Sequence, residues 1–259
     1  MELKFEKAEG QSKEGGSWKM TAPVAEELDA TKVARLVDLL KKVDASRFVA
    51  PVAKAPEYGL DQPSITLTMT SRAKPGTGGE PAAYKLLLAD KDGKLYALVD
   101  GEPLIFEMGR GLVEFLEKPM GKEPWGKFDQ DRASVVELFG PDIKLDFVRA
   151  GKEWTAENAP DFKTNSSRVT WYLGDLAGAD AAKIVAYAAK DLAAYGLDKP
   201  QWRVHVKGLG FDKTFLVSDK GPTPDKYATI EGSARVVVLD ASTVARIAKD
   251  KSNFNAGQQ

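Results

Sequence analysis

A six-residue motif occurs twice in this chain, as YGLDQP at 58–63 and as YGLDKP at 195–200. Glycine reaches left-handed φ angles without steric cost and so ends a helical turn. The proline that follows favours an extended start to a strand. The motif therefore predicts a corner from a helical turn into a strand, built once in each half of the chain. The alternative is that its tyrosines and aspartates form a binding pair across the duplication. The residues common to both copies are Tyr58, Gly59, Leu60, Asp61 and Pro63, and Tyr195, Gly196, Leu197, Asp198 and Pro200.

The duplication extends far beyond this motif. The matched segments are, in order, Trp18 with Trp154, 44–50 with 180–186, and Tyr96-Ala97 with Tyr227-Ala228. The spacing between copies is 136 residues at the tryptophans, 137 at the motif and 131 at the last pair, so the order is kept throughout. Conserved order over this length indicates a tandem repeat. We expect a first repeat unit at residues 1–127 and a second at 128–259.

Each unit reads as a sheet with helices on one side. Apolar residues at i, i+3, i+4 and i+7 predict helices over 30–42 and 166–177. Strict alternation over 64–70 and 201–207 predicts strands with one buried and one solvated face. The predicted fold class is α+β: two tandem pseudo-symmetric repeats, each a mainly antiparallel sheet with helices packed on one face. Side chains expected to cap helices are those of Asp29, Asn165 and Asp240.

The two units differ at their edges. A further predicted strand at 134–139 precedes the first matched strand of the second unit and has no counterpart in the first. We therefore expect the opening strand of the first unit to be truncated and the natural chain to continue upstream. Residues 73–81 read as an inserted loop, and the linker is expected to be pinned by Trp125. The polar tail at 252–259 is expected to fray.

The composition argues against several classes of site. The net charge of −1 predicts no general attraction to nucleic acid, and the absence of cysteine excludes thiolate chemistry and disulfides. The one histidine, His205, alternates with basic residues on the solvated face of a strand, which favours a surface role over a catalytic one. Acidic pairs at 90–92 and 129–131 lie in turns and are interleaved with other polar residues. No catalytic, cofactor or metal motif is present, so we expect a protein that is not an enzyme and holds no cofactor or metal.

The repeated features together resemble one bacterial family, the domain of unknown function 4340. The resemblance rests on both tryptophans, both corner motifs, the segments 47–49 and 183–185, and the Tyr-Ala pairs at 96–97 and 227–228. It covers most of the chain. Members of that family typically carry an N-terminal membrane anchor with the repeats outside the cytoplasm, and many are found beside ABC transporters of the type associated with gliding motility. The resemblance implies a periplasmic location, an inner-membrane anchor upstream of Met1 and a transporter complex as partner. It implies no catalytic residue, because none is established for the family.

Tryptophans are the remaining candidates for a functional surface. Trp18 and Trp154 recur in both units and are expected in the core, and Trp202 lies on the buried face of its strand. Trp125 and Trp171 are the candidates for a partner surface, because exposed aromatic residues anchor partners.

Three functions remain open from the sequence. The leading one is a non-enzymatic extracytoplasmic binding or scaffold module, auxiliary to an ABC transporter of the gliding-associated type. The alternative is a carbohydrate- or lipid-binding module that uses a cleft between the two repeats. A third is a hydrolase with a carboxylate site that no motif reveals.

Overall fold

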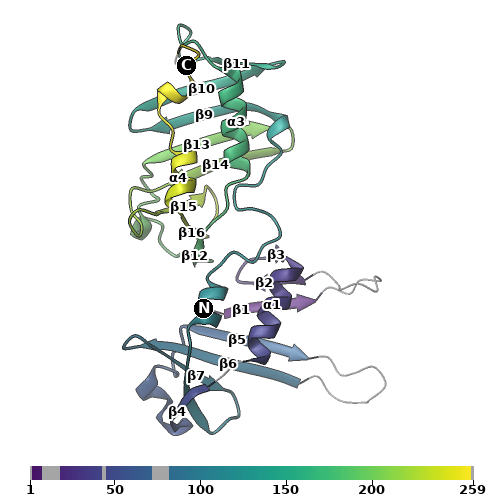
Figure 1. The fold of residues 1–259 in the computed structure, drawn as a ribbon, viewed down its shortest axis with the longest axis vertical. Coiled ribbons are helices and arrows are strands. Elements are labelled where there is room, and N and C mark those ends of the chain that lie inside the picture. Colours follow the sequence, from purple (N-terminus) through teal and green to yellow (C-terminus); the bar gives the residue numbers. More distant parts are fainter. Residues whose placement is uncertain (1, 8–17, 43–44, 72–81, 258–259) are drawn as a thin grey trace, which may run out of the picture. The chain divides into compact units, whose positions relative to one another are not determined.

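The computed structural model describes residues 2–7, 18–42, 45–71 and 82–257 (Figure 1). It divides the chain into two compact units. Unit 1 comprises residues 1–116 and 120–122, and unit 2 comprises residues 117–119 and 123–259. The expected boundary between residues 127 and 128 lies slightly downstream of this division. The predicted inserted loop at 73–81 lies outside the described residues.

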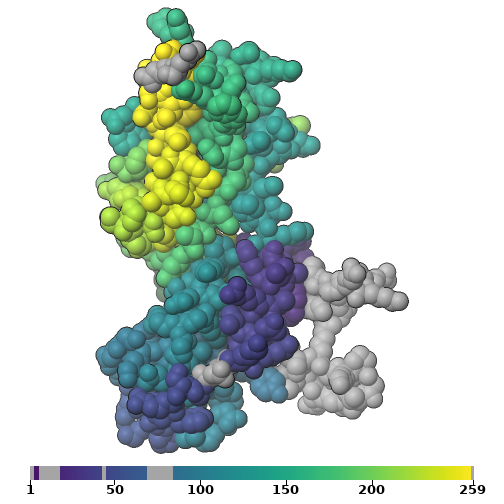
Figure 2. Space-filling view, in the orientation of Figure 1, coloured from purple at the N-terminus to yellow at the C-terminus, as the bar shows by residue number. Residues whose placement is uncertain are grey.

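Unit 1 is an eight-stranded sheet in the order β3-β2-β1-β5-β6-β7-β8-β4. Two helices cover one of its faces, and α1 is visible in purple on the surface of the unit in Figure 2. The strands are β1 (Glu2–Lys7), β2 (Trp18–Ala22), β3 (Glu26–Glu27), β4 (Ala45–Pro51), β5 (Ile65–Ser71), β6 (Ala82–Lys91), β7 (Lys94–Val99) and β8 (Leu104–Met108). The helices are α1 (Ala30–Lys41), the 3-10 helix η1 (Val52–Tyr58) and α2 (Gly111–Leu116).

Unit 2 repeats this arrangement in the order β11-β10-β9-β13-β14-β15-β16-β12. Helices α3 and α4 lie side by side over one face of its sheet (Figure 1). The strands are β9 (Ala133–Gly140), β10 (Ile143–Ala150), β11 (Glu153–Ala156), β12 (Lys183–Ala186), β13 (Trp202–Gly208), β14 (Phe211–Val217), β15 (Lys226–Ile230) and β16 (Val236–Leu239). The helices are α3 (Ser166–Ala177), α4 (Ala241–Ile247) and three 3-10 helices, η2 (Gln130–Arg132), η3 (Ala193–Tyr195) and η4 (Lys251–Phe254). The predicted α+β fold with two tandem repeats is confirmed.

The sheets differ at one strand. In unit 2, β9 lies between β10 and β13 and pairs antiparallel with both. Among the described residues of unit 1, β9 has no counterpart, and β1 instead pairs directly with β5. That pairing is parallel and joins only Glu2 to Thr66 and Leu3 to Leu67. All other strand pairs among the described residues of both units are antiparallel.

The helix-covered face holds the larger core of each unit. In α3 the predicted apolar stripe is fully buried, whereas in α1 the first two positions of the stripe, Val33 and Leu36, are buried and the next two, Val37 and Leu40, are only half-buried. All three predicted capping side chains accept backbone N–H groups: Asp29 from Thr31 and Lys32, Asn165 from Arg168, and Asp240 from Thr243.

Part of the second face of each sheet is also buried, whereas the alternation over 64–70 and 201–207 predicted a solvated face there. In unit 1 the corner motif inserts Leu60 against Ala50, Ala89, Leu98 and Ile105. In unit 2 it inserts Leu197 against Leu216 and Val236. The glycine of each corner has the expected left-handed φ, 73° and 69°. The helical turn before the corner is longer in the first copy, where η1 spans Val52–Tyr58.

The C-terminal segment is ordered to residue 257, so the prediction of a frayed tail is wrong for 252–257. The side chain of Asp250 accepts from Ser252 and Asn253 and, with the Asn253 side chain, forms a capping box for η4. Phe254 is buried. The backbone N–H of Asn165 donates to Phe254 O at 2.8 Å, and in unit 1 the matching Asp29 N–H donates to Met120 O at 3.0 Å. The segment after each last helix therefore returns to the start of the long helix.

The two corner glycines allow a matched test of the second core. We expect Gly59→Ala to destabilise the protein by about 1 to 2 kcal/mol, because an L-residue is strained in the left-handed region. Gly196→Ala should lower the free energy of unfolding by more. The added Cβ at residue 196 would lie 2.5 Å from Ser218 Oγ, whereas the one at residue 59 would lie 3.6 Å from Ala89 Cβ. Urea unfolding measures both, with Gly109→Ala as control, since a Cβ there meets nothing within 4 Å. Equal losses in all three variants would contradict the proposed strain.

The cap at Asp240 predicts a pH dependence. The hydrogen bond from the Thr243 backbone N–H, and next the one from Ser242, hold the pKa of Asp240 below its ordinary value. A depressed folded-state pKa stabilises the fold above the ordinary aspartate pKa of about 3.9, and that contribution is lost as the pH falls through the folded value. Asp240→Ala should therefore cost about 1 kcal/mol at neutral pH, and the deficit should shrink as the pH approaches 3. Glu157→Ala removes an exposed carboxylate that caps no helix, and its unfolding curve should track the wild type at every pH.

Candidate functional site

The corner residues pack within their own units. Tyr58 forms an edge-to-face pair with Tyr96 at 4.8 Å between ring centroids, and Tyr195 forms the same pair with Tyr227 at 5.2 Å. Each pair places a tyrosine of the corner against the first residue of the matched Tyr-Ala segment, so both repeated sequence features meet at one contact. These contacts assign the corner a role in packing.

The two predicted partner-surface tryptophans lie in different surroundings. Trp125 is half-buried and packs edge-to-face against Phe215, which is fully buried. The next residue, Gly126, donates its N–H to Ala179 O at 2.8 Å. Trp125 thus holds the linker on unit 2. Trp171 is 70% exposed on the outer side of α3 and remains a candidate anchor.

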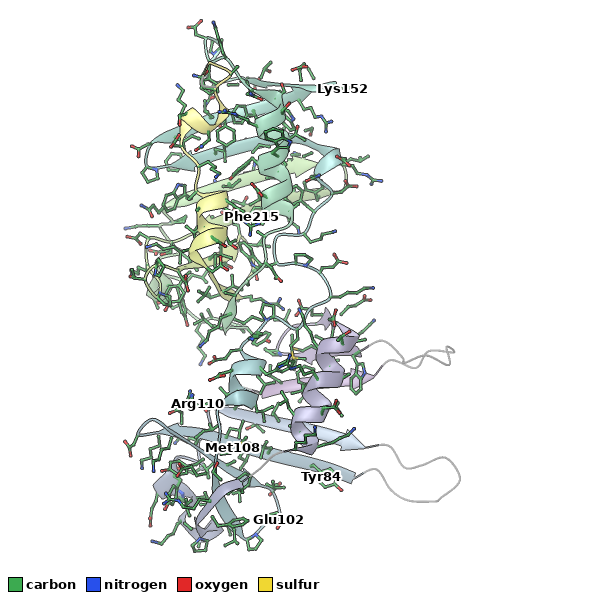
Figure 3. All side chains as sticks on the ribbon, viewed as in Figure 1. Tyr84, Glu102, Met108, Arg110, Lys152 and Phe215 are labelled. Carbon is green, nitrogen blue, oxygen red and sulfur yellow. The ribbon has the colours of Figure 1, made fainter. Side chains whose placement is uncertain are left out.

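Trp18 departs from the expected core position. Trp154 is buried, but its counterpart Trp18 is only half-buried. Trp18 instead lines a pocket of about 220 Å³ between α1 and the sheet of unit 1. The walls are formed by apolar residues of β1, β2, β5, β6, β7 and α1, and the more polar lining residues are Thr68, Tyr84 and Lys85. Tyr84, on β6, is exposed (Figure 3).

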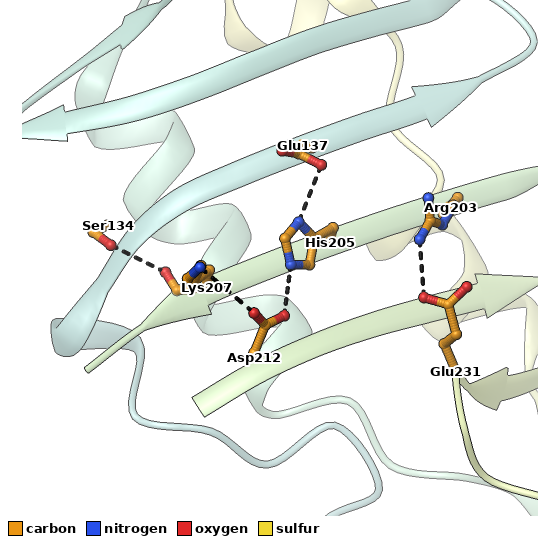
Figure 4. A network of polar contacts seen from close by, with 7 residues as sticks. All are labelled: Ser134, Glu137, Arg203, His205, Lys207, Asp212 and Glu231. Carbon is orange, nitrogen blue, oxygen red and sulfur yellow. Dashed lines mark hydrogen bonds and ion pairs between the residues drawn. The ribbon is translucent and has the colours of Figure 1, made fainter. Parts of the chain in front are cut away.

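A polar network crosses the solvated face of the unit 2 sheet (Figure 4). His205 Nδ1 lies 3.0 Å from Glu137 Oε2, and its Nε2 lies 2.7 Å from Asp212 Oδ1. Lys207 Nζ is 3.8 Å from Asp212 Oδ2. Sequence reasoning placed His205 on this face but missed both carboxylates, because they come from neighbouring strands whose register the sequence does not reveal. The arrangement is a ladder of side-chain hydrogen bonds and holds no nucleophile aligned with the imidazole among the described residues.

A second ion pair lies on the same face. Arg203 pairs with Glu231 at 2.9 Å, and this hydrogen bond holds the pKa of Glu231 below its ordinary value. Among the remaining titratable groups, burial raises the pKa of Tyr172, whose hydroxyl donates to Ile247 O at 3.0 Å. Burial also lowers the pKa of Lys213, which donates to Lys127 O.

The acidic pairs of the sequence serve local structure. Asp90 pairs with Arg110, Asp92 occupies the left-handed region of a hairpin turn, and Asp129 caps η2. Among the described residues, no group of three or more His, Cys, Asp or Glu side chains is placed to hold a metal ion. Across the same residues, no helix is both long and apolar enough to cross a membrane.

The edge strands β4 and β12 differ in how far neighbouring residues cover them. In unit 2, the N–H of Ile184 donates to Glu117 O at 2.6 Å, and Lys183 Nζ pairs with Glu117 Oε2 at 2.7 Å. Ile184 is 5% exposed. The matched residue of β4, Phe48, is 64% exposed. Val52 and Leu104, which adjoin β4 and its partner β8, are exposed as well.

The comparison with family models matches this chain in two segments, residues 18–137 and 154–256. The first segment extends from unit 1 into residues 123–137 of unit 2. The matching model is described as a domain of unknown function, DUF4340. The chain belongs to this family. The two matched segments begin at Trp18 and Trp154, the first pair of residues that marks the duplication. No curated protein and no solved structure matches the chain.

The ladder around His205 should contribute little to stability. We expect His205→Ala to lower the free energy of unfolding by less than about 1 kcal/mol, because the two carboxylates that it contacts are at least half exposed and can form hydrogen bonds with water instead. Arg203→Ala should also cost less than about 1 kcal/mol, and that loss should shrink in high salt, because solvent and salt screen an exposed ion pair. Urea unfolding at low and high ionic strength measures both effects, with Arg203→Ala as the companion variant of the second pair. A salt-independent loss of several kcal/mol would contradict this assignment.

Proposed function

We propose that this DUF4340 chain is a non-enzymatic binding or scaffold module that acts outside the cytoplasm, auxiliary to an ABC transporter. The observation that carries the binding role is the outer edge of β4 with its exposed Phe48. Location and transporter partner rest on the family resemblance. The third possibility, a hydrolase, draws no support from the carboxylates described above, which lie in caps, turns and exposed polar contacts.

Strand β12 of unit 2, which corresponds to β4, shows what kind of segment can cover such an edge. In unit 2 a linker residue, Glu117, accepts the outward N–H of Ile184 and pairs with Lys183. The matched residues of unit 1 are Arg47 and Phe48, again a basic residue followed by a large apolar one. Edge strands commonly bind an extended segment of a partner through main-chain hydrogen bonds, with side-chain pockets adding specificity. Arg47 is already paired with Glu107 at 3.0 Å, so the precedent of β12 extends to the main-chain contact. The occupant proposed for β4 is therefore an extended segment of the transporter complex.

Trp171 offers a second contact for a protein partner. It belongs to α3 of unit 2, and tryptophan is over-represented among residues whose truncation weakens interfaces most. Its 70% exposure leaves the indole available to a partner.

The alternative function left open by the sequence is carbohydrate or lipid binding. One observation favours it, the apolar pocket of unit 1. Its wall of Leu, Val and aromatic side chains suits a lipid better than a sugar, because a sugar needs many hydrogen-bond partners.

A capture experiment tests the proposed function. The tagged chain is incubated with detergent-solubilised membranes of the source cells, and bound proteins are identified by mass spectrometry. We expect an ABC-transporter subunit to be recovered by the wild type and Leu209→Ser, and recovery to fall at least about tenfold, or about 1.4 kcal/mol, with Phe48→Ser. Leu209 is the matched control because it is 75% exposed on the hairpin between β13 and β14.

Two outcomes would contradict the proposal. The first is that no transporter subunit is recovered by the wild type. The second is equal recovery by Phe48→Ser and Leu209→Ser, which would remove the β4 edge from the interface. Trp171→Ser, measured in parallel, shows whether α3 contributes to the same capture.

A further inference from the structure

In unit 1 a pocket lies under α1, at positions where side chains fill the core of unit 2. The strand pairings and repeat spacings match its lining residues to residues of unit 2. Four of the apolar lining residues have larger counterparts: Leu36 corresponds to Tyr172, Val37 to Leu173, Leu86 to Phe215 and Val99 to Ile230. One has a smaller counterpart, because Leu67 corresponds to Val204. Phe5 and Trp18 keep their identity as Phe147 and Trp154, yet they are half-buried where their counterparts are buried.

The segment after the last helix adds to this difference. In unit 2, Phe254 packs its ring against Phe147 at 5.3 Å and against Tyr172 at 5.3 Å. In unit 1 the carbonyl of Met120 accepts the matching backbone hydrogen bond. The side chain of Met120 is not aromatic. The space that an aromatic cluster occupies in unit 2 therefore remains as a pocket of about 220 Å³ in unit 1.

The dimensions and walls of the pocket point to an elongated apolar ligand. An engineered apolar cavity of about 150 Å³ stays free of water and binds benzene, so a pocket of this volume accepts a larger apolar group. Its lining on α1 runs from Val33 to Leu40. At 1.5 Å per helical residue, this stretch spans about 10 Å, which suits a chain better than a compact ring.

We propose that this pocket binds a single aliphatic chain, such as the acyl chain of a fatty acid. The chain lies beneath α1 against Phe5, Trp18 and Leu86. The site is independent of the partner-binding function proposed above, because β4 and Phe48 take no part in its lining.

Isothermal titration calorimetry of the purified chain with hexanoate, octanoate, decanoate and dodecanoate tests this site below the micellar concentration of each. Burial of one methylene group is worth about 0.8 kcal/mol, so each added methylene should tighten binding about three- to fourfold until the chain outgrows the pocket. The absence of binding, or affinities that do not depend on chain length, would overturn the proposal.

Variants that introduce the side chains of unit 2 locate the ligand. Leu86→Phe introduces the side chain of Phe215 and should reduce decanoate affinity at least about tenfold, while the same substitution at the exposed Leu209 should leave it unchanged. Val37→Leu, which introduces the side chain of Leu173, is a milder filling that keeps the test valid if Leu86→Phe does not fold, as judged by circular dichroism. Wild-type affinity in both filled variants would overturn the assignment to this pocket.

Discussion

Each corner motif buries one leucine, Leu60 or Leu197, on the face of the sheet opposite the helices. The helices cover one face of the sheet and the corner covers part of the other, so the central strands β7 and β15 are packed on both sides. The left-handed glycine immediately before the leucine makes this possible, because it ends the 3-10 turn and directs the chain back over the sheet. The adjoining tyrosine then rests edge-to-face on the tyrosine of β7 or β15. The motif recurs in the sequence because the same contact is made twice.

The two units use this common frame differently. Unit 2 fills its helix-covered core with aromatic side chains and closes it with Phe254, and its edge strand β12 is covered by Glu117. Unit 1 has smaller side chains at the matching core positions and leaves Phe48 exposed on β4. Both proposed binding regions of unit 1 therefore lie where its packing departs from that of its repeat. Divergence of this kind is how a duplicated fold acquires sites, since function resides in local features and not in the fold as a whole.

Prediction succeeded where one residue's own chemistry decides the outcome. Asp29, Asn165 and Asp240 are recognisable as caps because a short polar side chain before an apolar stripe satisfies the free N–H groups of a first turn. It failed where distant segments meet. The tail around Phe254 is polar in sequence, but its one aromatic ring is held between β10 and α3. The recurrence of Trp18 as Trp154 predicted a core residue, but burial also depends on how large the neighbouring side chains are.

The sequence alone determined the duplication, the α+β class, the helix-covered face and the family, because repeat spacing, apolar periodicity and the glycine-containing corner are local properties of the chain. The tertiary structure decided which candidates lie near one another. It placed Glu137 and Asp212 on either side of His205, opened the pocket beside Trp18, and left Phe48 exposed while covering Ile184. These outcomes depend on strand register and on the volumes of side chains brought together from distant positions. The repeated corner, by contrast, could be recognised at once, because all of its residues are consecutive.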